Sequence, residues 1–172
     1  LAGPIGLKRI LIDGERETAI PIAVAAVLAT PFGVWLLSVT PADVARVAIA
    51  LLAIAAFALM FVPAKEAAVP GRKETWATGV AAGVLTGFAS MPGPPVVPYY
   101  AGRDLPRPTI KASMQLIFTI AACAGLASAT WLGILRPELL LFALVMLPMI
   151  IAGNRLGARV SGRVSDPAWR VT

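Results

Sequence analysis

Residues 87–100 carry the feature that most limits what this chain can fold into. Four prolines and one glycine fall between Pro92 and Pro98, within sequence that is otherwise apolar. Because proline lacks an N–H group and its ring clashes with the preceding turn, we expect no helix to continue through these residues. Irregular backbone at membrane depth is stable only where protein buries it or water reaches it. The stretch therefore predicts the tip of a broken helical hairpin that lines a cavity, an element at which many transporters bind substrates.

The composition places the chain among membrane proteins. Of its 172 residues, 58% are hydrophobic and 14% are charged, compared with about 25% charged in soluble domains. Apolar runs long enough to cross a bilayer recur, so we predict an all-α, polytopic helical bundle. The net charge of +6 does not indicate nucleic-acid binding, because Lys and Arg cluster at the ends of the apolar segments. With no histidine and a single cysteine, we expect no metal and no cofactor.

Apolar segments separated by polar turns are predicted to form the helices. They are residues 19–39, 41–62, 75–90, 108–135 and 137–156, and residues 63–74 form a polar loop. In the third segment Gly79, Gly83 and Gly87 fall four apart, on one face of the helix. Because small residues at this spacing let two backbones approach closely, we expect this face to contact another helix of the bundle.

The sequence also suggests an internal repeat. When Gly33 is aligned with Gly157, Arg46 falls on Arg170, and the order of apolar helix, glycine and polar turn agrees. Chance similarity between apolar helices is the alternative. The repeat predicts that residues 1–62 end a first half whose beginning lies upstream, that 63–74 are a cytoplasmic loop, and that 75–172 form the second half.

The positions of Lys and Arg distinguish two ways of threading the proline-rich stretch. Loops rich in these residues face the cytoplasm, which places residues 63–75 inside. If residues 75–100 crossed the membrane once, the basic segments 103–111 and 155–170 would lie outside, against this rule. If the chain instead enters, breaks and returns, both segments lie inside, and the two halves become inverted copies, as in many secondary transporters. We predict the hairpin; the single crossing is the alternative.

Two motifs resemble a known family. The first is GFASMPGPP at residues 87–95, preceded by Gly83 and followed by Tyr99. The second is GNRLGAR at residues 153–159, followed by SDP at residues 165–167. Together they resemble the sulfite exporter TauE/SafE family of membrane permeases. The resemblance implies a transporter of the bacterial inner membrane for small anions such as sulfite, sulfoacetate or related sulfonates.

We predict a small-anion site where the helix that ends near Ser90 meets the break. Backbone N–H groups at a break lack helical partners, and helix N-termini attract anions. Ser90 adds a hydroxyl donor, and Gln115 is a polar group in an apolar span that needs a partner or water. The substrate-binding candidates are Ser90, Met91, Gly93, Pro94, Tyr99, Lys111 and Gln115.

The candidates other than Gln115 have structural alternatives; for Gly93 and Pro94 the alternative is a rigid turn. Ser90 can bond back to its own helix, and Met91 can serve packing alone. Tyr99 can anchor the chain at the membrane interface, and Lys111 can be a surface charge that sets topology.

Other functions explain less of the sequence. An enzyme would need a nucleophile with a base or a cluster of acids, but the acidic residues fall in loops. A channel would need a ring of charge or a filter-like repeat. A non-transporting scaffold or assembly subunit would use the small-residue faces, yet it does not explain a broken apolar hairpin. The expected partners are a small anionic substrate and the lipid bilayer, without nucleic acid; a homodimer is an open alternative to a monomer.

Overall fold

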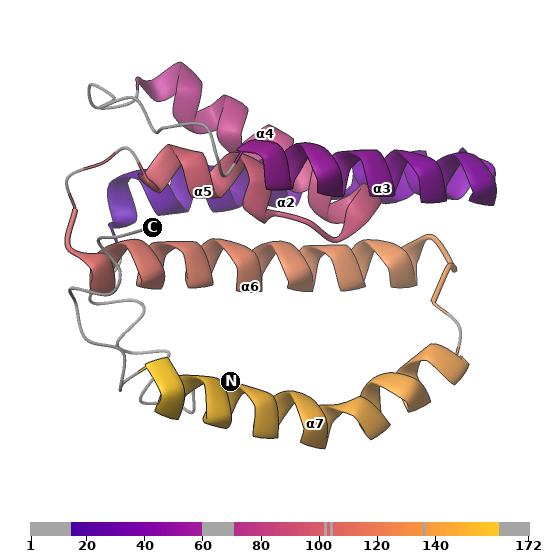
Figure 1. The fold of residues 1–172 in the computed structure, drawn as a ribbon. Coiled ribbons are helices and arrows are strands. Elements are labelled where there is room, and N and C mark those ends of the chain that lie inside the picture. Colours follow the sequence, from indigo (N-terminus) through magenta and orange to yellow (C-terminus); the bar gives the residue numbers. More distant parts are fainter. Residues whose placement is uncertain (1–14, 60–70, 102, 104, 136, 162–172) are drawn as a thin grey trace. The chain divides into compact units, whose positions relative to one another are not determined.

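The structure, a computed structural model, describes residues 15–59, 71–101, 103, 105–135 and 137–161, and every regular element among them is an α-helix (Figure 1). The helices are α2 (Arg16–Val39), α3 (Ala42–Leu59), α4 (Arg72–Ala89), α5 (Gly93–Ala101), α6 (Arg107–Trp131) and α7 (Pro137–Ser161). Helices α2 to α6 belong to one compact unit, and α7 belongs to another. The predicted all-α class is therefore confirmed.

The centre of the first unit is the pair of helices α2 and α4. A Cβ atom built at Gly83 would lie 2.4 Å from the carbonyl oxygen of Ala26, and one at Gly87 would lie 2.3 Å from that of Thr30. The glycines meet α2 in register, Gly79 at Ile22, Gly83 at Ala26 and Gly87 at Thr30, so the two helices run parallel. The prediction that this glycine face contacts another helix of the bundle is confirmed.

Helix α4 begins three residues earlier than the sequence predicted. The backbone N–H of Gly71 donates to Glu74 Oε2 at 3.0 Å, which caps a helix that starts at Arg72. A carboxylate in the first turn also interacts favourably with the helix dipole. The charged residues 72–74, assigned to the polar loop from sequence, therefore form the first turn of α4.

The proline-rich stretch is more helical than predicted. The break is confined to Ser90–Pro92, and α5 begins at Gly93. Pro94 and Pro95 fall in the first turn of α5, where a helix needs no N–H donor, so the rings are tolerated there. The expectation that no helix continues through residues 92–98 was wrong because it treated all four prolines as interior residues; only Pro98 lies beyond the first turn.

Helix α5 turns back alongside α4. Tyr99, near its end, has its Oη 2.8 Å from Oγ1 of Thr75, in the first turn of α4. The chain thus passes down α4, breaks, and returns toward the start of α4, which is the hairpin that the basic segments favoured over a single crossing. The start of α4 and the end of α5 lie at the same end of the unit (Figure 1).

Helix α6 packs beside α2 and ends at Trp131, four residues before the predicted end. Gly133 has a φ of +67°, a conformation that favours glycine and ends helices. The N–H groups of Gly133 and Ile134 donate to the carbonyls of Thr130 and Ala129 at 3.1 and 3.0 Å. These bonds satisfy carbonyls that the end of the helix would otherwise leave open.

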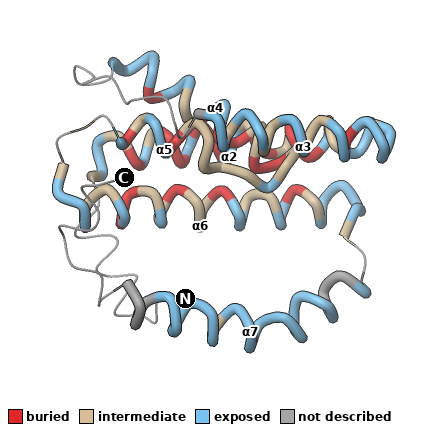
Figure 2. The backbone as a smooth tube through the Cα atoms, in the orientation of Figure 1, coloured by how far each residue is buried: buried red, intermediate tan, exposed pale blue. Residues whose placement is uncertain are grey.

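The core of the first unit lies where α2, α4, α5 and α6 converge (Figure 2). Its buried residues are Ala19, Ile22, Ala23, Ala82, Val96, Tyr100 and Ile117. Outside this core, α3 exposes an apolar stripe of Val44, Val47, Leu51, Ile54 and Phe57. Among the described side chains of α7, all but Ile151 are exposed.

Apolar exposure of this kind fits a lipid environment. Among the described residues, two helices are long and apolar enough to cross a membrane by length and composition, namely α2 and α6. A shorter apolar stretch, Leu141–Gly157, lies within α7.

Candidate functional site

The break between α4 and α5 is a closed turn. Ser90 has φ 55° and ψ 30°, the left-handed conformation that caps α4. Its N–H donates to the carbonyl of Thr86 at 2.9 Å, and the N–H of Met91 donates to that of Leu85 at 3.2 Å. The expectation that N–H groups at the break lack helical partners is therefore wrong for Ser90 and Met91, because the left-handed residue folds them back onto α4.

The residues at and just after the break are partly accessible to solvent. Met91, Gly93 and Pro94 are half-buried, whereas Ser90 is exposed. A Cβ atom built at Gly93 would meet only Cγ2 of Val97, at 3.9 Å, so space is open around this glycine. The turn is thus closed by hydrogen bonds at Ser90 and Met91, and the unfilled space lies beside Gly93, at the start of α5.

A largely buried ion pair lies at the opposite end of α5. The guanidinium of Arg103 faces the carboxylate of Glu15, the residue that precedes α2. Nη2 lies 2.6 Å from Oε1, and Nη1 donates to Oε2. The two side chains are only 9% and 19% exposed. A forked, charge-assisted contact of this kind is the strongest geometry that an arginine forms with an oxyanion.

Hydroxyl groups from three helices surround this pair. Thr18 Oγ1 donates to Glu15 Oε2 at 2.6 Å, accepts from Arg103 Nη1 at 3.1 Å, and lies 3.1 Å from Oη of Tyr100. Ser113 Oγ, on α6, accepts the backbone N–H of Glu15 at 2.9 Å. The fully buried Tyr100 thus places its hydroxyl among the polar groups.

The tyrosine rings also contact the arginine. Cζ of Arg103 lies 5.7 Å from the ring centroid of Tyr99 and 5.9 Å from that of Tyr100. Aromatic faces at this distance stabilise a cation that has lost water. We refer to Glu15, Thr18, Tyr99, Tyr100, Arg103 and Ser113 as the Arg103 cluster. Its members come from α2, α5, α6 and the segments next to them, so the hairpin fold is what assembles it.

The family model for the sulfite exporter TauE/SafE matches residues 7–172. The chain belongs to this family. It matches no curated protein and no solved structure.

Of the residues predicted to bind substrate in this TauE/SafE chain, Tyr99 alone lies in the Arg103 cluster. Its hydroxyl bonds to Thr75 and its ring faces Arg103, so it points into the unit rather than serving only as an interface anchor. Ser90, Met91, Gly93 and Pro94 lie together at the break, at the other end of α5. Their role in binding stays a prediction.

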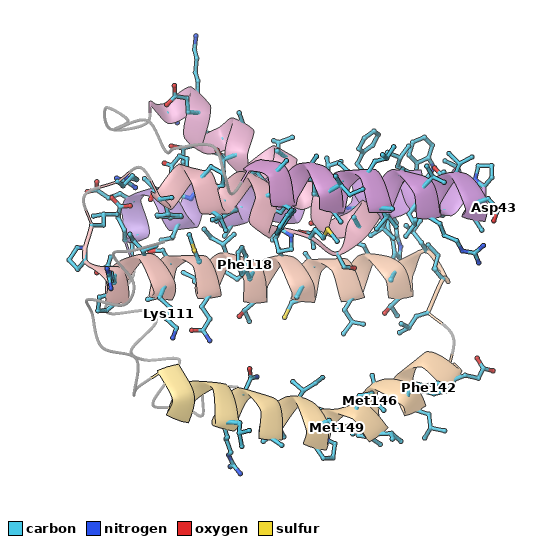
Figure 3. All side chains as sticks on the ribbon, in the orientation of Figure 1. Asp43, Lys111, Phe118, Phe142, Met146 and Met149 are labelled. Carbon is cyan, nitrogen blue, oxygen red and sulfur yellow. The ribbon has the colours of Figure 1, made fainter. Side chains whose placement is uncertain are left out.

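Lys111 and Gln115 are not brought to the break. Both side chains are exposed on α6, whereas Ala112, Ser113 and Ile117 form the buried face of that helix. Lys111 points away from α2, α4 and α5 (Figure 3). Gln115 lies two residues after Ser113, which accepts a hydrogen bond from Glu15 at the start of α2. Ser90 instead caps the C-terminal end of α4. The structure therefore separates Gln115 from Ser90, which the sequence placed in one site.

Sequence reasoning for this TauE/SafE chain missed the ion pair. From sequence, Arg103 belongs to the basic segment 103–111 and Glu15 is one of the acidic residues in loops, with nothing to pair them. The predicted hairpin contained a signal for this pair. It brings two segments to the same end of the bundle: the start of the span at residue 19, and the basic residues 103–111. Two opposite charges at one end of a bundle, next to tyrosines and threonines, are candidates for a buried pair.

Proposed function

We propose that this protein is a multi-pass permease of the bacterial inner membrane that exports small sulfur-containing anions, with sulfite, sulfonates and other organosulfur anions as the substrate class. The observation that carries the proposal is the family match, which spans residues 7–172. A substrate of this class is small, negatively charged and rich in oxygen acceptors. It needs a pathway that supplies donors in an otherwise apolar bundle.

Two features of the fold support this proposal. The first is the broken hairpin of α4 and α5, since helices that break within a bundle are common at transporter substrate sites. The second is a buried guanidinium at the end of that hairpin. A charged group inside an apolar helical bundle is expensive and is usually retained where it serves transport.

The charges at the same end suit the entry of an anion. Arg72, Lys73 and Lys111 are exposed in the first two turns of α4 and α6. Because α4 and α6 begin at the end of the unit that holds the Arg103 cluster, these cations would raise the local concentration of anions there. We infer that this end is the cytoplasmic mouth, and that Ser90, Met91, Gly93 and Pro94 contact the anion at the break.

The scaffold alternative is less favoured. It relied on the small-residue faces being available to a partner protein, but the face of Gly79, Gly83 and Gly87 is filled by α2 of the same chain. For an enzyme, we note that the described residues contain no group of three or more His, Cys, Asp or Glu that could hold a metal ion. Neither rival accounts for the returning helix.

The test is transport by the purified full chain in proteoliposomes. We expect uptake of radiolabelled sulfite or a labelled sulfonate above that of empty liposomes, with competition by the unlabelled anion and not by chloride. If no anion of a sulfite, sulfonate and carboxylate panel crosses faster than in protein-free vesicles, the permease assignment is wrong. Co-purification of a stoichiometric membrane partner by a protein without transport would then support the scaffold.

A further inference from the structure

We propose that Arg103 binds the transported oxyanion directly, and that Glu15 occupies this site as an internal competitor until the anion displaces it. The proposal rests on the proposed function, because it names a site for the same anion. It assigns the two residues different roles: Arg103 is a binding residue, and Glu15 lowers the affinity of the site so that the anion can leave.

The contact between Arg103 and Glu15 has the shape of a bound oxyanion. Nη1 and Nη2 of Arg103 reach the two oxygens of one carboxylate, side by side. Sulfite, sulfonates and carboxylates all present a pair of oxygens that the same guanidinium fork can bind. Glu15 therefore occupies Arg103 in the way that a small oxyanion would.

Arg103 is largely shielded from solvent. Its side chain is 9% exposed, and besides Glu15 it contacts the hydroxyl of Thr18 and the rings of Tyr99 and Tyr100. A buried cation that loses its anionic partner is strongly destabilised. An oxyanion partner therefore stabilises Arg103, and release of Glu15 is most favourable when another anion takes its place.

Hydroxyl groups beside Arg103 could also donate to a bound anion. The hydroxyls of Thr18 and Tyr100 lie 3.1 Å apart, and that of Thr18 already reaches both Arg103 and the carboxylate. A sulfonate has more oxygens than a guanidinium fork can satisfy, so it needs hydroxyl donors of this kind. The cluster provides them without adding a second positive charge, which keeps release possible.

Glu15 lies at the edge of α2. Its side chain does not cap the backbone N–H groups of that helix, and the carboxylate is tied to α2 by the hydroxyl that Thr18 donates. The backbone is held separately, through the N–H that donates to Ser113 Oγ. The carboxylate can therefore swing off Arg103 while the start of α2 stays in place.

The experiment compares anion binding by the full chain and by Glu15→Gln, using sulfite and methanesulfonate with calorimetry in detergent. The glutamine keeps the shape of the side chain and removes the competing charge. Because a like charge in the same site opposes anion binding, we expect Kd to fall by roughly tenfold or more. If Ser113, Thr18 and Arg103 only tie helices together, Glu15→Gln should lower thermal stability and leave Kd unchanged, which would overturn the proposal.

Two further variants keep the test informative if an unpaired arginine misfolds. Arg103→Lys keeps the positive charge but loses the fork, and the double variant Glu15→Gln/Arg103→Gln removes both charges of the pair; both should bind the anion more weakly than the parent. Asp43→Asn/Arg46→Gln is the matched control, because it removes an ion pair of 2.8 Å whose side chains are 93% and 77% exposed. That control should bind like the parent. Retention of the parental Kd in either Arg103 variant would contradict the proposal.

The same variants separate this proposal from the permease assignment. If the parent transports sulfite and the Arg103 variants transport it equally well, the chain is a permease and its anion site lies elsewhere. If the parent transports nothing but Glu15→Gln binds sulfite tightly, the site stands and the permease assignment fails. If even Glu15→Gln binds neither probe, the Arg103 site is wrong.

Discussion

Ser90 is held in a conformation that few residues other than glycine adopt. Its φ of 55° brings Cβ close to the following carbonyl, a strain that glycine does not have. We predict that Ser90→Gly stabilises the protein by about 0.5–1 kcal/mol, measured as a higher unfolding temperature in detergent. Ser38→Gly is the matched control, because Ser38 is an exposed serine within α2, where glycine weakens a helix. Equal destabilisation by both substitutions would show that the turn is not left-handed in solution.

Two substitutions at Ser90 distinguish a structural role in the turn from a role in binding the anion. Both Ser90→Gly and Ser90→Ala remove the hydroxyl, but only the glycine relieves the backbone. If the hydroxyl contacts the anion, as the sequence predicts, both should raise KM for transport although their stabilities change in opposite directions. If KM instead changes only in the variant that is less stable, Ser90 serves only to cap α4.

Among the elements, α5 is joined to the start of α4 by a polar contact that can be tested. Thr75 is buried, and its Oγ1 lies 2.8 Å from Oη of Tyr99. Thr75→Val keeps the volume but leaves the tyrosine hydroxyl without this partner, which should cost about 1–3 kcal/mol. In Thr75→Val/Tyr99→Phe both polar groups are gone, so we expect part of that loss to be recovered. Thermal unfolding of the two single variants and the double variant measures the coupling; strictly additive losses would mean that α5 does not return to the start of α4.

The pairing of α2 with α4 gives the sharpest prediction at this scale. In Gly83→Ala the new Cβ would lie 2.4 Å from the carbonyl oxygen of Ala26, so the helices must separate. We expect a loss of about 1–3 kcal/mol, as for other overpacked sites, and a greater loss for Gly83→Leu. Gly157→Ala is the control, since a Cβ there meets nothing within 4 Å. Normal stability of Gly83→Leu in detergent, together with normal transport, would place this face toward lipid.

The sequence was informative where a residue type has one structural meaning. A glycine face spaced by four predicted the α2–α4 contact, and the basic segments predicted the returning hairpin. The extent of α5 could not be predicted, because whether Pro94 and Pro95 break or begin a helix depends on where the helix starts, not on composition. The Arg103 cluster also escaped sequence reasoning, since Glu15 and Arg103 meet only after three helices have packed. The internal repeat stays a prediction.

For the whole molecule, the topology can be tested by cysteine labelling. Cys123 is exposed, so it is first replaced by alanine. Lys73→Cys and Arg107→Cys, in the first turns of α4 and α6, should react with an impermeant maleimide from the same side of the membrane. Asp43→Cys, at the start of α3, should react only from the opposite side. Labelling of Lys73→Cys and Arg107→Cys from different sides would contradict the hairpin.

The glycine contact between α2 and α4 also limits how this unit can change shape during alternating access. No layer of side chains separates the two backbones, so any sliding would drive carbonyl oxygens of α2 into main-chain atoms of α4. We therefore expect the pair to move as one rigid body. Helix α5 is nine residues long, joins α4 through the short turn Ser90–Pro92, and is held at its far end by hydroxyl contacts and the Arg103–Glu15 pair. We therefore expect any rearrangement within this unit to be a movement of the short helix α5 about the turn Ser90–Pro92.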